Sequence, residues 1–356
     1  MASSEELHAL RSAVAEVTTQ RRFDDGIWSD LAAMDLLGLL IPERYGGAGA
    51  GLIEAEVVAE EMGRELFCGP YLSTAVLGVN LLAAVDDPGH CEPVLRDIAT
   101  GGTRVAVAFA EGIHARPPAT PATVARGETA VTLTGIKQFV LDAEGADLLY
   151  VLASAAIDSA DPGPGIYAVT PTAPGVTIEA LTSVDASRRL CTVRFDEAPA
   201  TAVGRPGRGL EALRTALDRS AVTLLGEQAG AARRAMEMAR DYAKTRYQFG
   251  RAIGSFQAVK HLCADMLLEA ESAVSAARHV ARSYGSAGWA ADLAMAQAYC
   301  SEAFLFVAAN NIQVHGGIGF TWEHPAHRYL RRARGDAQLF GGPPWHRERY
   351  LREIGA

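Results

Sequence analysis

The spacing of apolar residues divides the chain into three blocks of different texture. Residues 1–98 and 206–356 repeat apolar positions every three or four residues, which predicts helices, whereas residues 99–205 hold short apolar runs that predict strands. A chain of 356 residues is longer than one hydrophobic core usually fills. We therefore expect three domains with an α+β arrangement, because helices, strands and helices in succession argue against an alternating βαβ (Rossmann) fold.

Two helical patterns stand out in the first block. Trp28, Leu31, Met34 and Leu37 recur at three-residue spacing, and residues 53–65 form a second amphipathic run. A glycine-rich stretch at residues 45–51 separates them. Because no Gly-Lys-Ser/Thr follows this stretch and no strand precedes it, a structural turn is favoured over a phosphate-binding loop.

The middle block predicts a small antiparallel β-domain. Its apolar runs are separated by Gly, Pro, Asp and Ser, which are typical of turns. Residues 115–121 contain three prolines and are expected to form a loop. The predicted strands begin at Val105, Ala130, Leu148, Gly165 and Cys191.

The final block begins with an apolar stripe of Phe256, Val259, Leu262 and Met266, followed by alanine-rich helical sequence at residues 286–311. A net charge of −9 argues against a nucleic-acid partner and against an anionic membrane surface. No apolar run approaches the roughly 18 to 20 residues that span a bilayer, and no signal peptide is evident, so a cytoplasmic location is expected.

Cysteines and histidines suggest no further chemistry. The five cysteines are far apart and odd in number, which favours free thiols over disulfides or a metal site. His261, His315 and His346 form no evident Ser/His/Asp arrangement and lack metal-ligand spacing.

Two specific motifs lie in the final block. Arg246-Tyr-Gln-Phe-Gly-Arg-Ala-Ile-Gly-Ser-Phe-Gln257, with Ala264-Asp-Met266 behind it, resembles one signature of the acyl-CoA dehydrogenases. Gln313-Val-His-Gly-Gly-Ile-Gly-Phe320, followed by an arginine-rich segment at residues 331–334, resembles a second. Both stand in the family's order behind a β-domain of the expected size. The resemblance thus covers essentially the whole chain, and it implies a helical N-terminal domain, a β-barrel-like middle domain and a C-terminal four-helix bundle.

The resemblance also implies FAD at a subunit interface, an acyl-CoA substrate and electron-transfer flavoprotein as the acceptor. The family's arginine at the position of Arg246 meets the pyrophosphate of a neighbouring subunit's FAD, a task that suits a planar, permanently charged guanidinium. Glycine permits close backbone approach to the cofactor. Within these motifs His315 is interpreted as a variable residue. The expected cofactor-binding set is Arg246, Gln248, Phe249, Gln257, Gln313, Gly316 and Gly317.

The catalytic base of the family is missing at its usual position. A glutamate is expected there, but ungapped counting from the arginine-rich segment reaches Phe340, which cannot accept a proton. Some members place the base on an earlier helix, where this chain has Ser220. Asp218 and Glu227 lie nearby and are weak candidates, for which solvated or ion-paired helix charges are the favoured interpretation.

Residues that would face the flavin ring depart from the family as well. The family's T-E-P string is Ala110-Glu-Gly112 here, the G-S-D after it is replaced by residues 114–118, and its W-I-T string is Phe139-Val-Leu141. A hydroxyl that would bond to flavin has thus become a leucine side chain. Ring contacts are lost, whereas residues lent to a neighbour's FAD are kept.

Three hypotheses follow. The first is a base-lacking subunit of a heteromeric FAD-dependent acyl-CoA dehydrogenase, similar to the α2β2 assemblies that some actinobacterial, FadE-like members form for steroid side-chain CoA thioesters. The second is a self-sufficient homo-oligomer that uses Asp218 or Glu227 as base. The third is a non-enzymatic scaffold or acyl-CoA-binding subunit. The acyl chain itself is not fixed by the sequence.

Overall fold

The structure is a computed structural model that describes all residues except 1–2, 20–24, 128–129, 156–162 and 206. Contacts between residues separate two compact units. The helical unit comprises Met1–Arg21, Leu52–Phe67 and Ala221–Ala356, and the sheet unit comprises Arg22–Gly51 and Cys68–Ser220. The domain limits expected from the sequence stay a prediction. The two units are defined by contacts and each combines segments that are distant in the sequence, so their limits cannot be compared directly with consecutive domains.

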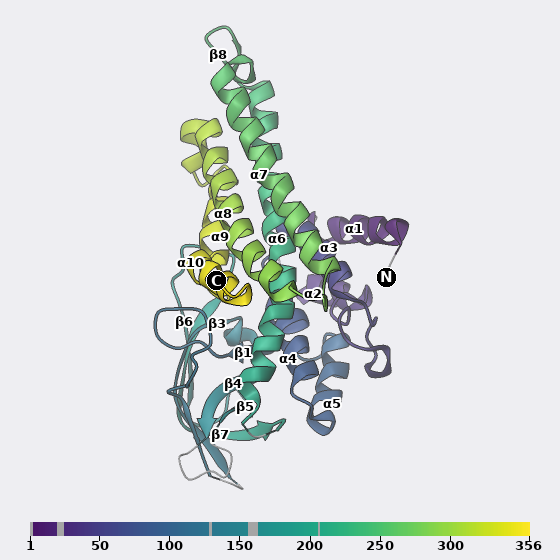
Figure 1. Ribbon diagram of the computed structural model, residues 1–356, viewed down its shortest axis with the longest axis vertical. Helices are drawn as coiled ribbons and strands as arrows, with labels where there is room; N and C mark the ends of the chain where they lie inside the picture. Colours follow the sequence, from purple (N-terminus) through teal and green to yellow (C-terminus); the bar gives the residue numbers. More distant parts are fainter. Residues whose placement is uncertain (1–2, 20–24, 128–129, 156–162, 206) are drawn as a thin grey trace. The chain divides into compact units, whose positions relative to one another are not determined.

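Long helices make up the helical unit (Figure 1). Their core is rich in alanine, with Met266, Phe304 and Val307 fully buried, which brings helix axes close together. A Cβ on Gly63 of α3 would lie 2.0 Å from the carbonyl oxygen of Glu227 in α6, so these helices touch backbone to backbone. The helices are α1 (Ser4–Thr19), α3 (Leu52–Arg64), α6 (Gly209–Thr245, of which this unit contains the part from Ala221), α7 (Gln257–Arg282), α8 (Trp289–His315), α9 (Ala326–Asp336) and α10 (Pro343–Glu353).

The sheet unit contains a seven-stranded sheet together with α2 (Asp25–Ala33), a π-helical segment at Tyr71–Gly78, α4 (Val79–Ala84) and α5 (Pro88–Ala99). The sheet curls into a ring, because β4 pairs with β2, β2 with β3, β3 with β7, β7 with β5, and β5 again with β4. The strands are β1 (Val105–Ala108), β2 (Val124–Arg126), β3 (Val131–Leu141), β4 (Leu148–Ala155), β5 (Pro164–Val169), β6 (Val176–Ala180) and β7 (Leu190–Val203).

The barrel-like sheet and the helical blocks confirm the expected fold class, with two corrections to the sheet. The sheet contains two short strands, β2 and β6, that were not predicted from the sequence. It is mixed and not purely antiparallel, because β1 and β2 both run parallel to β4. Apolar alternation reports which face of a strand is buried, but it does not report the direction of the neighbouring strand.

Two loop predictions are also confirmed. In the glycine-rich stretch, the N–H groups of Gly47, Ala48, Gly49 and Ala50 donate to backbone carbonyls of residues 38–42, so they are not free to hold a phosphate. The segment at residues 115–121 forms no helix or strand. Within the described part of the chain, no helix is long and apolar enough to cross a membrane.

Candidate cofactor-binding surface

A short hairpin carries the first motif at the end of α6. Strands β8 (Tyr247–Gln248) and β9 (Arg251–Ala252) are joined by Phe249 and Gly250, whose φ angles are +53° and +78°. Turns of this type favour Asn or Gly at both positions, so a phenylalanine there is strained. Its ring is 91% exposed. An exposed aromatic ring on a strained turn is typical of a residue retained for contact with another molecule.

The residues around the hairpin form a donor set that suits an anionic ligand. Arg246 is exposed and makes no ion pair with any other described residue, while its backbone is fixed by 2.8 Å hydrogen bonds to Tyr242 and Ile253. Helix α7 begins at Gln257 after Phe256, which provides no side-chain cap, so its first N–H groups face outward at the positive end of the helix. No acidic residue occurs between Arg246 and Gln257. This combination fits a pyrophosphate.

The second motif begins at the end of α8, where Gln313, Gly316 and Gly317 are all exposed. His315, between them, is only 5% exposed, and its Nδ1 lies 2.8 Å from the carbonyl oxygen of Asn311. Its ring stacks on Tyr242 of α6 at a centroid distance of 4.3 Å. Since Tyr242 lies one turn before Arg246, this stack holds the two motifs side by side.

The sequence analysis missed the role of His315, which it interpreted as a variable residue. Burial lowers the pKa of His315, and the nearby His324 lowers it further, so the ring packs as a neutral aromatic. The sequence contained a hint of this contact. Tyr242 lies four residues before Arg246 and His315 lies directly before Gly316, so each ring is within one helical turn of a motif residue.

Exposed apolar side chains accompany both motifs. Tyr247 is 65% exposed on the hairpin, and Phe320 and Trp322 are 75% and 69% exposed just after the second motif. Large apolar side chains left in solvent mark surfaces that contact another molecule. All seven residues of the expected cofactor-binding set therefore lie exposed in one unit, accompanied by apolar side chains.

The position of the usual base holds no proton acceptor. Phe340 is 4% exposed with φ of +61°, and residues 337–345 contain neither Asp nor Glu. His346 lies next in the chain, with Nε2 3.0 Å from the carbonyl oxygen of Gly341. Burial, together with Arg349, lowers the pKa of His346 to about 4, so it is neutral near pH 7 and serves to fix this turn.

The two weak base candidates lie in different surroundings. Glu227 forms an ion pair with Arg332, whose side chain is fully buried and also donates a 3.0 Å hydrogen bond to the carbonyl oxygen of Phe67. Glu227 is therefore an ion-paired helix charge in the structure, and whether it also acts as a base stays a prediction. Asp218 is half-buried on α6. Ser220 is buried, and its hydroxyl donates to Ala216 and accepts from Asn80.

The segment expected to face the flavin ring contains a buried ion pair that the sequence analysis did not identify. Nζ of Lys137, which is fully buried, lies 2.6 Å from Oε1 of Glu111. Glu111 also accepts hydrogen bonds from the hydroxyl and the backbone N–H of Thr123. Burial lowers the pKa of Lys137 to about 8, although Glu111 opposes this shift. The sequence contained one hint of this ion pair, because a lysine at an inward position of an apolar strand needs a buried partner for its charge.

The pair stands beside an irregular stretch of β3. The register of β3 against β7 shifts between Lys137 and Val140, and Phe139 between them has φ of +54°. Leu141, at the position where the family has a hydroxyl, is 6% exposed. The strand is therefore irregular at this point, and the side chain at the position of the expected hydroxyl is apolar. Among the described residues, no group of three or more potential ligands could hold a metal ion.

Comparison with known proteins places the chain in one family. The profile of the acyl-CoA dehydrogenase N-terminal domain matches residues 6–101, and that of the C-terminal domain matches residues 207–354. Acyl-CoA dehydrogenase IpdE2 of Mycobacterium tuberculosis is 32% identical over 344 residues, which cover 94% of this chain and 89% of that protein. Acyl-CoA dehydrogenase FadE34 of the same organism is 35% identical over 93% of this chain, which spans only 42% of FadE34.

Solved structures agree with this assignment. A variant of the Tcur3481-Tcur3483 steroid ACAD is 28% identical with a TM-score of 0.86, covering 99% of this chain and 98% of that chain. The ChsE4-ChsE5 complex from Mycobacterium tuberculosis contains a chain that is 27% identical with a TM-score of 0.88, at the same coverage. Both domain profiles, the relatives and the observed fold lead to one conclusion: this chain is a member of the acyl-CoA dehydrogenase family of flavoprotein oxidoreductases.

Proposed function

We propose that this chain is a base-lacking subunit of a heteromeric, FAD-dependent acyl-CoA dehydrogenase, and that it lends the nucleotide-binding edge of the FAD site to a partner subunit. The observation that carries the proposal is an asymmetry within the chain. The two motifs for the nucleotide end are exposed and joined by the Tyr242–His315 stack, whereas the position of the base is the buried Phe340.

The proposed division of labour follows from the chemistry of the residues. Bound FAD would accept the β-hydride of an acyl-CoA thioester after a base has removed the α-proton. Arg246 and the amino-terminal N–H groups of α7 would hold the pyrophosphate, with Gln248, Phe249 and Gln257 along the nucleotide. Gln313, Gly316 and Gly317 would approach the ADP portion. The α-proton would go to a carboxylate of the partner, since residues 337–345 supply none.

The alternative of a self-sufficient homo-oligomer is weakened by the state of its proposed base. Glu227 is the counter-ion of a fully buried arginine, and a carboxylate held in this way favours its charged form and is a poor proton acceptor. A non-enzymatic scaffold would have no need for an exposed, unpaired arginine next to an uncapped helix terminus. The experiment below has a separate outcome for each of these two alternatives.

The names of the similar proteins support a partner subunit. One solved structure is a complex of two differently named chains, ChsE4 and ChsE5, and another carries two names and is described as a steroid ACAD. We extend this to an α2β2 assembly in the cytoplasm, with a bulky acyl-CoA as substrate and electron-transfer flavoprotein as acceptor. The identity of the acyl chain is left to substrate screening on the assembled enzyme.

The test is to purify this chain alone and together with a co-expressed second dehydrogenase subunit, and to assay both with ferricenium as acceptor. The proposal predicts activity only in the co-purified complex. Turnover by the lone chain that is abolished in an Asp218→Asn or Glu227→Gln variant would support the homo-oligomer. A complex that assembles without FAD, and whose flavin content is unchanged by Arg246→Ala, would support the scaffold.

A further inference from the structure

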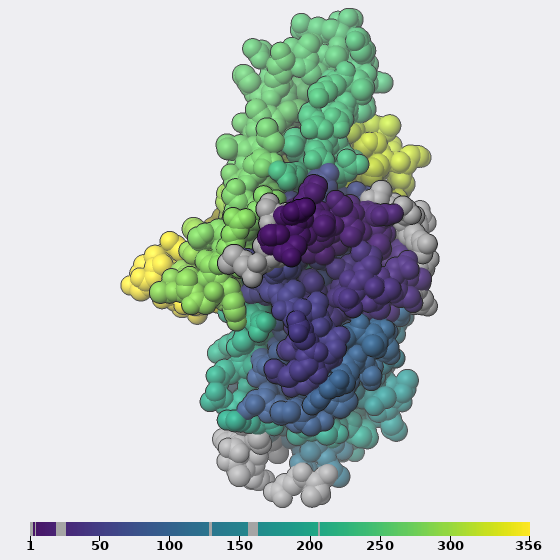
Figure 2. All heavy atoms as spheres, turned by 90° about the vertical axis from the view of Figure 1, so that its right-hand side faces the viewer, coloured from purple at the N-terminus to yellow at the C-terminus, as the bar shows by residue number. Residues whose placement is uncertain are grey.

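A small cavity lies among α1, α3 and α7 of the helical unit, away from the cofactor-binding residues. Its volume is about 220 Å³, and its charged or titratable lining residues come from all three helices. In the space-filling view, α1 is the purple helix on the surface facing the reader (Figure 2). The polar lining residues are His8 and Arg11 of α1, Glu56 of α3, and Arg278 and Arg282 of α7.

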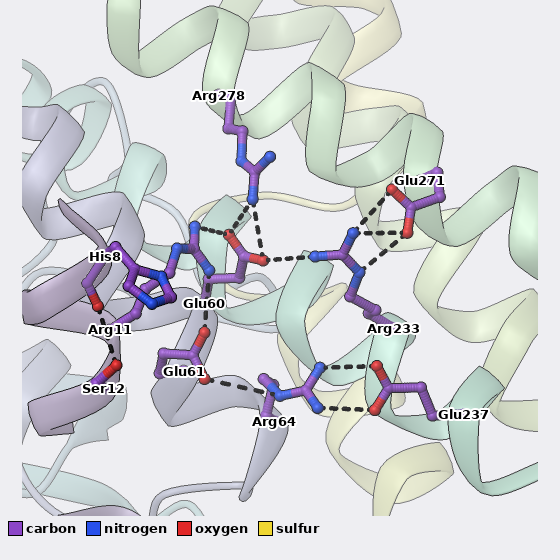
Figure 3. Close-up of polar contacts among 10 residues, drawn as sticks. All are labelled: His8, Arg11, Ser12, Glu60, Glu61, Arg64, Arg233, Glu237, Glu271 and Arg278. Atoms are coloured by element: carbon purple, nitrogen blue, oxygen red, sulfur yellow. Dashed lines mark hydrogen bonds and ion pairs between the residues drawn. The ribbon is translucent and has the colours of Figure 1, made fainter. Parts of the chain in front are cut away.

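Two of the arginines are held in place by one buried carboxylate (Figure 3). Glu60 is 1% exposed and lies 2.5 Å from Nη2 of Arg11 and 3.1 Å from Nη2 of Arg278. Arg233 of α6 adds a third contact at 3.3 Å. Burial alone would raise the pKa of Glu60, but the hydrogen bonds from Arg11 and Arg278 lower it overall. The guanidinium groups are therefore fixed before any ligand arrives.

Glu56 provides the second, independent observation. Its side chain is 1% exposed and lines the cavity, yet its carboxyl group makes no hydrogen bond with any described residue. Oε1 is completely covered, so only Oε2 can reach a ligand in the cavity. Buried polar groups are nearly always hydrogen-bonded, so an orphan of this kind calls for an explanation. Arg282 of α7, which is exposed and also lines the cavity, has no hydrogen bond or ion pair with another described residue.

We infer that this cavity binds a small oxyanion, either a carboxylate or a phosphate, between Arg282, Arg278 and the carboxyl group of Glu56. Guanidinium groups match the oxygens of both ligand types. The protonated carboxyl group of Glu56 donates a hydrogen bond to the ligand from Oε2. The site is separate from the FAD residues and does not depend on the proposed function.

The contribution of Glu56 to binding should weaken as pH rises, because Glu56 must carry a proton to act as donor. Burial raises the pKa of Glu56 to about 7, and the negative charge of Glu60 adds to the rise. The positive charges of three arginines lower the pKa of Glu56, with the largest effect from Arg278, then Arg11, then Arg282. His8 of α1 also lines the cavity, Cys300 of α8 faces Glu56 with its own pKa raised by burial, and α6 meets the backbone of Glu56 through Gly226.

Isothermal titration of the full chain with inorganic phosphate and with succinate, at pH 6 and pH 8, tests the inference. We expect saturable binding of at least one probe, and which one binds identifies the ligand class. Arg282→Ala should weaken binding about tenfold, since one charge-assisted contact is lost. Arg352→Ala, which removes an exposed arginine of α10, is the matched control and should leave binding unchanged.

Glu56→Gln gives a readout that a merely structural role would not affect. The amide keeps an N–H donor at every pH, so with the same probe the variant should lose less affinity than the wild type between pH 6 and pH 8. The ionisation of the probe itself is common to both proteins and cancels in this comparison. The inference is overturned if neither probe binds saturably, if Arg282→Ala and Arg352→Ala behave alike, or if Glu56→Gln keeps the wild-type pH dependence.

Discussion

The ring of His315 stacks on the ring of Tyr242 with centroids 4.3 Å apart and planes inclined by 29°. This contact joins the end of α8 to the end of α6, and each helix leads directly into one of the two motifs expected to hold FAD. The donors of the hairpin and the exposed glycines after α8 therefore belong to one rigid structure. The arrangement of the two motifs thus depends on the ring contact of a buried histidine.

The first prediction concerns this stack. His315→Ala should lower the free energy of unfolding by about 1 to 2 kcal/mol, because a buried aromatic contact and a hydrogen bond are lost. It should also lower the flavin content of the co-purified complex, since the two motifs are no longer fixed to each other. Flavin absorbance per complex measures this effect.

His315→Phe is the matched control for that prediction. Phenylalanine preserves the stack on Tyr242 but cannot donate to Asn311. It should retain most of the flavin. Equal loss in both variants would show that the hydrogen bond, and not the stack, positions the motifs.

The second prediction separates ion pairing from catalysis at Glu227. Glu227→Gln should destabilise the helical unit by about 3 to 5 kcal/mol, because the buried charge of Arg332 loses its counter-ion. The fraction of complex that folds should keep its kcat. Denaturant unfolding and turnover per folded complex measure the two effects. A stable variant without turnover would identify Glu227 as the base.

The third prediction concerns the buried pair in the sheet unit. Glu111→Gln should cost about 3 kcal/mol at pH 7, because it leaves Lys137 buried without an anion. Lys137→Met should cost less, since Glu111 keeps its hydrogen bonds from Ala122 and Thr123. In the double variant part of the stability should return. Strictly additive losses in a double-mutant cycle would contradict a direct interaction.

The fourth prediction uses the buried His346. Its pKa in the folded chain, about 4, lies below the unfolded value of roughly 6.5, so the folded state binds fewer protons between these pH values. The stability that depends on its neutral form is complete above pH 6.5 and is lost as pH falls toward 4, by about 3 kcal/mol. His346→Gln should remove this part of the pH dependence. The measurement is the free energy of unfolding of the wild type and of His346→Gln at pH 7 and at pH 4.5. An equal loss of stability in the two proteins between these pH values would contradict the prediction.

The sequence predicted the order of the secondary structure well, because periodicity reports burial directly. The apolar stripe that leads to Met266 became α7, and the continuous apolar run from Leu148 became β4. It missed β2 and β6, because β2 has only three residues and β6 contains no fully buried residue. It also failed on strand direction, since the parallel pairing of β1 and β2 with β4 depends on contacts between distant segments.

In the candidate site, too, the features that depend on contacts between distant residues could not be predicted from the sequence. The motif residues are recognisable because their chemistry and spacing are specific, and their exposure on one unit agrees with the expectation. The supporting residues were not recognisable: His315, Lys137 and Arg332 act through a ring contact and ion pairs with residues 26 to 105 positions away. Such pairings follow from the fold and not from any local pattern.

The most direct test of the central claim is the ratio of FAD to protein in the purified species. If this chain lends a phosphate-binding edge and has no flavin site of its own, the co-purified complex should hold one FAD for each pair of unlike chains. The lone chain should hold almost none, and Arg246→Ala should strip the complex of FAD where Arg352→Ala does not. Tight FAD at one per chain in the lone protein would contradict the account.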